Sequence, residues 1–66
     1  MTAAEIADRL WLKYCQDLPA EKRANAAMLI SDMKRDLTLF PGLARDIIND
    51  TKTALKSLRE TEDVIG

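Results

Sequence analysis

Two prolines divide this chain into three segments, and each segment repeats apolar residues at helical spacing. Proline lacks an amide proton and disfavours a helical conformation in the residue before it, but its fixed φ suits the first turn of a new helix. Pro19 and Pro41 therefore predict an all-α protein with helices at about 2–16, 19–38 and 42–60. An alternative is one long helix that is only kinked at Pro19.

The apolar residues of each segment fall on one side of a helical wheel. The first segment opens with Thr2 and Glu5, whose spacing matches a capping box that satisfies free amides of the first turn. The stripes of the second and third segments comprise Ala26, Leu29, Ile30, Met33 and Leu37, and then Leu43, Ala44, Ile47, Ile48, Thr51, Ala54, Leu55 and Leu58. The sequence thus predicts a small two- or three-helix bundle that forms a single helical domain over 1–66.

The chain is short for a free-standing hydrophobic core. At 66 residues a domain buries only about 60% of the surface that its unfolded chain exposes. One Cys and no His exclude an internal disulfide and a zinc site with the usual four nitrogen or sulfur ligands. We therefore expect a homodimer, formed through one of two apolar stripes: Ile47, Ala54 and Leu58, or Met33 and Leu37.

The residue types argue against catalysis. Without His, no Ser/His or Cys/His nucleophile system can form within one chain, and the two glycines match no phosphate-binding loop. Asp32 with Asp36, and Asp46 with Asp50, are four apart and could bridge a divalent ion, but their basic neighbours favour solvated charge. Cys15 is expected to be a packing residue. We expect no enzyme, no cofactor and no metal.

The charge pattern and hydropathy limit the partners. The net charge is −1 with alternating signs, and the basic excess typical of nucleic-acid binders is missing. The longest apolar run, 26–30, has five residues, far short of the roughly 20 that span a bilayer. We therefore expect no membrane partner. A single unpaired Cys without a signal peptide favours the cytoplasm of a bacterial or host cell.

Several large apolar residues fall outside the stripes or crowd the second connector. Together with a wide aromatic edge on the first helix they exceed what three short helices can cover, which indicates an interaction surface. The sequence predicts a non-enzymatic regulatory protein, of the phage or bacterial inhibitor or anti-activator type, that binds and inhibits or modulates a larger protein. The predicted contacts are Trp11, Tyr14, Met28, Leu39 and Phe40, with Arg35 and Arg45 as rim charges. Alternatively, Trp11 and Tyr14 simply close the core.

A helix-turn-helix DNA-binding regulator is the second hypothesis, because the element lengths suit that motif. In the third helix, Asp46 and Asp50 would repel the phosphate backbone. The second helix is the better candidate for the DNA-recognition helix, with Lys22, Arg23 and Asn25 as its contacts. This hypothesis predicts an affinity for duplex DNA that falls steeply with salt.

Overall fold

The computed structural model of this chain describes residues 1–60, so the part of the predicted domain at 61–66 lies outside the described residues. The described part holds three α-helices and no strand, which confirms the all-α prediction. A π-helical turn, η1, extends the first helix, and a 3-10 turn, η2, precedes the last. In chain order the elements are α1 (Ala3–Leu10), η1 (Trp11–Cys15), α2 (Ala20–Leu39), η2 (Pro41–Leu43) and α3 (Ala44–Glu60).

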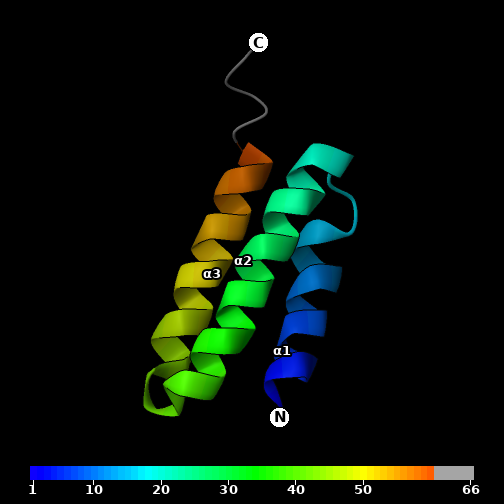
Figure 1. Ribbon diagram of the computed structural model, residues 1–66. Coiled ribbons are helices and arrows are strands. Elements are labelled where there is room, and N and C mark those ends of the chain that lie inside the picture. The colour runs from blue at the N-terminus through cyan, green and yellow to red at the C-terminus, as the bar shows by residue number, and fades with distance from the viewer. Residues whose placement is uncertain (61–66) are drawn as a thin grey trace.

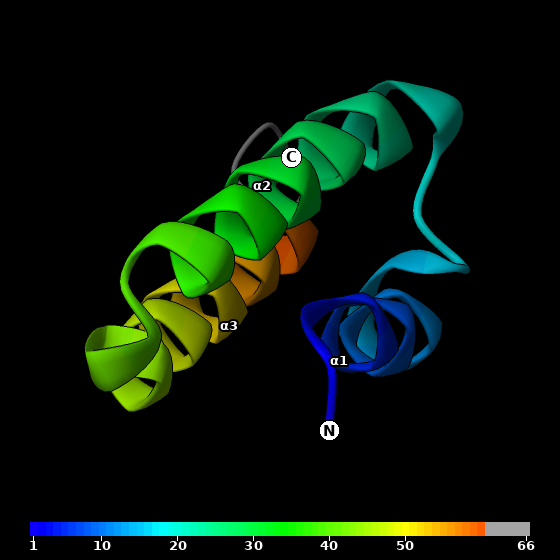
Figure 2. The same ribbon diagram turned by 60° about the horizontal axis from the view of Figure 1, so that its bottom comes forward.

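The three helices lie side by side in an elongated bundle of 41 × 17 × 16 Å (Figure 1). Successive helices run in opposite directions, so α1 and α3 are parallel to each other. Helix α2 packs against both of its neighbours, whereas α1 and α3 contact each other little. In Figure 2, where the view is turned by 60°, α2 and α3 lie together across the picture and α1 is set apart from α3. The helix α2 therefore forms the central layer.

The predicted capping box starts α1. The Glu5 amide donates to Thr2 Oγ1 at 3.2 Å, and the Thr2 amide donates to Glu5 Oε1 at 3.0 Å. Hydrogen bonding of the Glu5 carboxylate by Thr2, from the Thr2 amide first and the Thr2 side chain second, lowers the pKa of Glu5 because it favours the ionised form. The pair thus satisfies backbone groups that a helix start leaves open.

The predicted helix at 2–16 is not α-helical throughout, because its last turn is the π-turn η1. The Gln16 amide donates to the Trp11 carbonyl, five residues back, at 3.1 Å. The wider turn brings Cys15 onto the same face as Leu10, whose carbonyl lies 4.0 Å from the Cys15 sulfur. Cys15 is fully buried, so the prediction that it is a packing residue is confirmed.

The chain breaks at Pro19, and the alternative of a single kinked helix is wrong. The Leu18 amide donates to the Cys15 carbonyl at 3.1 Å, which closes a turn after η1. Pro19 has an extended backbone, with ψ of 156°, and caps α2 from outside instead of forming its first helical residue. The Leu18 side chain is buried and anchors this turn to the core.

The core lies where the stripes of α2 and α3 meet the inner face of α1. Met33, Leu55 and Cys15 are its largest fully buried side chains. Met33 is 1% exposed and Leu37 is buried as well, so these two residues pack within one chain. They are therefore not exposed as a dimer stripe in this fold, and the homodimer itself stays a prediction. The other predicted stripe, Ile47, Ala54 and Leu58, is half-buried.

One residue of the third stripe departs from a simple helical pattern, and another is polar but buried. Leu43 was expected on the buried face, but the 3-10 turn holds it before α3 begins, and its side chain is 54% exposed. Thr51 is buried as expected, and its hydroxyl donates to the Ile47 carbonyl at 2.9 Å. That hydrogen bond lets a polar side chain sit in the core without an unsatisfied group.

Candidate functional site

Three large apolar side chains lie exposed where α2 turns into α3. Leu39 is 60% exposed, Phe40 52% and Leu43 54%. We call these three residues the apolar corner; it lies at the lower end of the bundle in Figure 1. Single exposed apolar residues are common, but a group of this kind within five positions of the chain is a feature of binding surfaces.

The local backbone explains why the corner faces solvent. The Phe40 amide donates to the Asp36 carbonyl at 2.8 Å, and φ of −132° with ψ of 66° then takes Phe40 out of the helix. The Leu43 amide donates to the Phe40 carbonyl at 2.9 Å and closes the 3-10 turn. This reversal ends the bundle, and no further element of residues 1–60 covers it.

The two predicted rim charges differ in their surroundings. Arg45 stands at the start of α3 and lines a shallow hollow at the corner together with Pro41 and Leu43. Arg35 lies one turn before Leu39 and contacts two carboxylates of its own helix, Asp32 at 3.7 Å and Asp36 at 3.5 Å. Arg45 therefore borders the apolar corner, whereas Arg35 neutralises acidic neighbours.

The structure places the aromatic edge away from the corner. Trp11 and Tyr14 belong to η1, are half-buried and pack against the core, as the alternative interpretation expected. The Lys13 ammonium lies 5.5 Å from the centre of the Tyr14 ring. Their role as partner contacts stays a prediction, but they form no common surface with Phe40.

Met28 is also isolated from the corner. It lies on α2 with 65% of its side chain exposed, as the wheel predicts, and precedes Leu39 by eleven residues. That spacing corresponds to about 16 Å along a helix. The structure therefore places Leu39, Phe40 and Arg45 around the α2–α3 reversal, with Arg35 one turn earlier on α2. It leaves Trp11, Tyr14 and Met28 elsewhere.

Leu43 was not predicted as a member of this surface, because its spacing fits the apolar stripe of the third helix. A signal was present in the chain, since Pro41 and Gly42 favour a turn, and a residue held in a turn does not follow the helical period.

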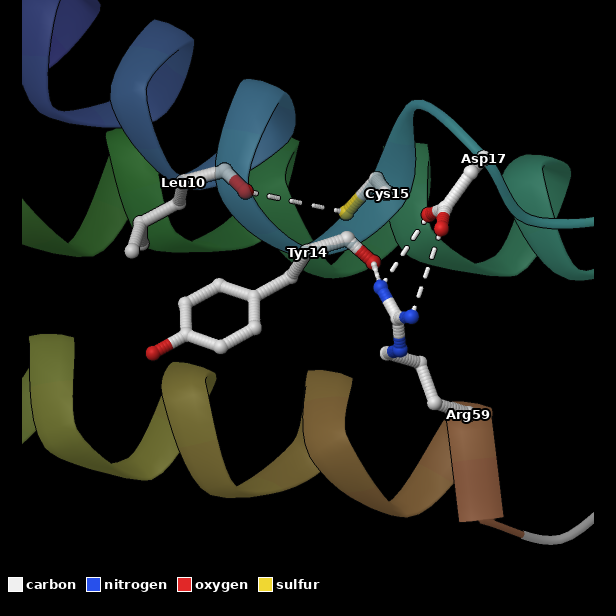
Figure 3. A network of polar contacts seen from close by, with 5 residues as sticks. All are labelled: Leu10, Tyr14, Cys15, Asp17 and Arg59. Atoms are coloured by element: carbon white, nitrogen blue, oxygen red, sulfur yellow. Dashed lines mark hydrogen bonds and ion pairs between the residues drawn. The ribbon is translucent and has the colours of Figure 1, made fainter.

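A polar network at the other end of the bundle ties the α1–α2 connection to α3 (Figure 3). The two terminal nitrogens of Arg59 donate to the two carboxylate oxygens of Asp17 at 3.1 and 3.3 Å, and one of them also donates to the Tyr14 carbonyl at 3.3 Å. Cys15 lies beside this network, and its burial raises the pKa of its thiol, an effect that the Arg59 charge partly offsets.

Within residues 1–60, no group of three or more His, Cys, Asp or Glu side chains is placed to hold a metal ion. In the same part of the chain, no helix combines the length and the apolar character of a membrane span. Comparison with protein families, with curated proteins and with solved structures gave no match for this chain. The candidate site therefore depends on its own geometry.

Proposed function

We propose that this chain is a non-enzymatic regulatory protein that binds a larger protein through the apolar corner and inhibits or modulates it. The observation that supports this is the exposure of Leu39, Phe40 and Leu43 at one end of a bundle whose core is otherwise filled. An interface of this kind gains affinity from the burial of a few anchors. The bound bundle would thus cover part of the partner's surface and block the access of other molecules to it.

Phe40 is the expected anchor of this interface. Aromatic side chains bury a large area with few rotatable bonds, and they are frequent among residues that dominate binding energy. Leu39 and Leu43 flank it on the preceding helix and in the same turn. The Arg45 charge at the edge would orient the partner and raise the association rate more than the affinity.

The test is capture of the partner from an extract of the cell that expresses the chain, followed by affinity measurement with the purified partner. Phe40→Ala and Leu43→Ala are expected to weaken binding by at least about tenfold each, without loss of helix content. Met28→Ala is the matched control, because it removes an equally exposed apolar side chain outside the corner. Equal binding by all three variants would place the contact elsewhere.

The location and the oligomeric state belong to the same proposal. An inhibitor or anti-activator of the phage or bacterial type would act in the cytoplasm, where its single thiol stays reduced. A homodimer would use the half-buried stripe of Ile47, Ala54 and Leu58, because Met33 and Leu37 are already buried. The apolar corner would then stay free in the dimer.

The DNA-binding alternative has less support. Helix α2 runs antiparallel to α1 before it and to α3 after it, whereas a helix-turn-helix crosses its two helices steeply. The Lys22 ammonium, one of its predicted contacts, donates to the Leu58 carbonyl of α3 at 2.7 Å. Salt-sensitive binding to duplex DNA that depends on Arg23 would nevertheless favour this alternative.

A further inference from the structure

A second surface lies between α1 and α3, separate from the apolar corner. The two parallel helices border a groove of about 450 Å³. Its floor is apolar and comes from both helices: Ile6 and Leu10 on α1, and Ile48 on α3. Leu10 is buried, and the two isoleucines are half-buried. We call this surface the α1–α3 groove.

The rim of the α1–α3 groove is basic on both sides. Arg9 and Lys13 line it from α1 and η1, and Lys52 lines it from α3. Among residues 1–60, no carboxylate lines it. A second hollow shares Lys13 with the groove and is lined also by Lys56, Arg59 and one carboxylate, Glu60. Within the described part of the chain, the ion pairs that the structure shows involve neither the three groove cations nor Lys56.

The basic character is local and does not reflect the whole chain, whose net charge is −1. The hollow between α2 and α3 carries the opposite sign, because Asp32, Asp36 and Asp50 line it. In the α1–α3 groove, three cations lie over an apolar floor without compensation from the lining residues. A ligand that complements it must present apolar groups flanked by negative charges.

We propose that the α1–α3 groove binds an acidic amphipathic helix of a partner protein. Such a helix would lay its apolar stripe on Ile6, Leu10 and Ile48 and complete a four-helix arrangement, which is a known mode of helix-in-groove recognition. Acidic residues on one flank would face Arg9 and Lys13, and those on the other flank would face Lys52.

The apolar floor separates this ligand from a nucleic acid. A phosphate backbone would pair with the cations but would leave the three aliphatic side chains without an apolar partner. The positions on each wall repeat at three or four residues, 6, 10 and 13 on one side and 48 and 52 on the other. The walls are therefore the faces of two helices, and a helical ligand laid along them would pack as one more helix of the bundle.

The probe is a designed peptide of about 18 residues with a leucine stripe at helical spacing and glutamates on both flanks. A second peptide carries lysine in place of every glutamate. Fluorescence anisotropy at about 0.1 M salt is expected to show at least about tenfold tighter binding of the glutamate peptide. Equal affinities, or no binding of the glutamate peptide, would overturn the proposal.

Variants locate the binding in the groove. Lys13→Glu combined with Lys52→Glu is expected to reverse the preference between the two peptides, and Ile48→Ala is expected to weaken binding of the glutamate peptide several-fold. The matched control is Arg23→Glu with Lys34→Glu, which changes the net charge equally on the exposed side of α2. An unchanged preference in the groove variant, or the same reversal in the control, would refute the assignment.

Two further measurements distinguish the acidic helix from other possible occupants of the groove. Tighter binding of duplex DNA than of the glutamate peptide, lost in the groove variant, would identify a nucleic-acid site and overturn the proposal. The protein alone could also form oligomers larger than a dimer that dissociate in high salt. That result would identify a second copy of the chain as the occupant of the groove, and would also overturn the proposal. Phe40→Ala should leave binding of the glutamate peptide unchanged. Failure of the groove proposal is therefore distinguishable from failure of the proposed function, which rests on the apolar corner.

Discussion

Replacing Leu55 with alanine is expected to cost far more stability than the same change at Leu43, although sequence alone places both leucines on one stripe. Leu55 is 0% exposed, whereas Leu43 is 54% exposed. Deleting a buried leucine side chain removes its transfer free energy and leaves a cavity, and such changes cost about 2–5 kcal/mol. Full burial of a leucine contributes about 1.5–3 kcal/mol, so truncating the half-exposed Leu43 should cost less than about 1 kcal/mol.

These magnitudes are large for a chain of this size. At about 0.05–0.15 kcal/mol per residue, 66 residues give a free energy of unfolding of about 3–10 kcal/mol. Leu55→Ala should therefore leave the bundle marginally folded, while Leu43→Ala should unfold near the wild-type midpoint. Urea unfolding followed by far-ultraviolet circular dichroism measures both variants, and protein concentration must be held constant because association would change the midpoint.

A cost for Leu43→Ala that approaches that of Leu55→Ala would refute the reasoning. It would mean that Leu43 is buried in solution, and that the apolar corner is consumed by folding or by self-association. The corner would then not be available to a partner protein.

Two further predictions concern the polar network around η1. Burial raises the thiol pKa of Cys15 above its ordinary value of 9.0, so the unfolded chain loses this proton at a lower pH than the folded chain does. The contribution of Cys15 to the free energy of unfolding is therefore full below the ordinary pKa and is lost as the pH rises above it. The urea midpoint should therefore fall more between neutral and alkaline pH in the wild type than in Cys15→Ala; equal falls would contradict the assignment. Asp17→Asn should cost less than about 1 kcal/mol, because the ion pair with Arg59 is largely solvent-exposed, and the cost should shrink in high salt. Thermal melts at two salt concentrations measure this change, and a larger, salt-independent loss would show that the contact is structural.

The helical architecture was predictable because its signals are local. The apolar periodicity and the Thr2 capping box specify helices, and Pro19 stops the first helical segment without any long-range contact. The all-α class follows from these features. The π-turn that closes η1 was not predicted, because apolar periodicity indicates a helix without distinguishing an α-turn from a π-turn, and η1 packs against both α2 and α3.

The candidate site was predictable only in part. Leu39 and Phe40 stand out in sequence because they crowd a short connector, and both are exposed. Met33 and Leu37 were expected to be available for a dimer, but a helical wheel cannot show whether a neighbouring helix covers a stripe, and here both residues are buried within the bundle. The basic α1–α3 groove unites residues about 40 positions apart, so no local pattern reveals it.

The central claim is that the apolar corner contacts another protein, and photo-crosslinking tests it most directly. A photo-reactive phenylalanine analogue at position 40 samples the corner, and the same analogue at position 28 samples the other exposed apolar site on α2. After irradiation in the expressing cell, position 40 should yield an adduct heavier than two copies of the 7.4 kDa chain, and position 28 should not. An adduct of two copies alone at position 40, or equal yields of the same adduct at both positions, would contradict the account.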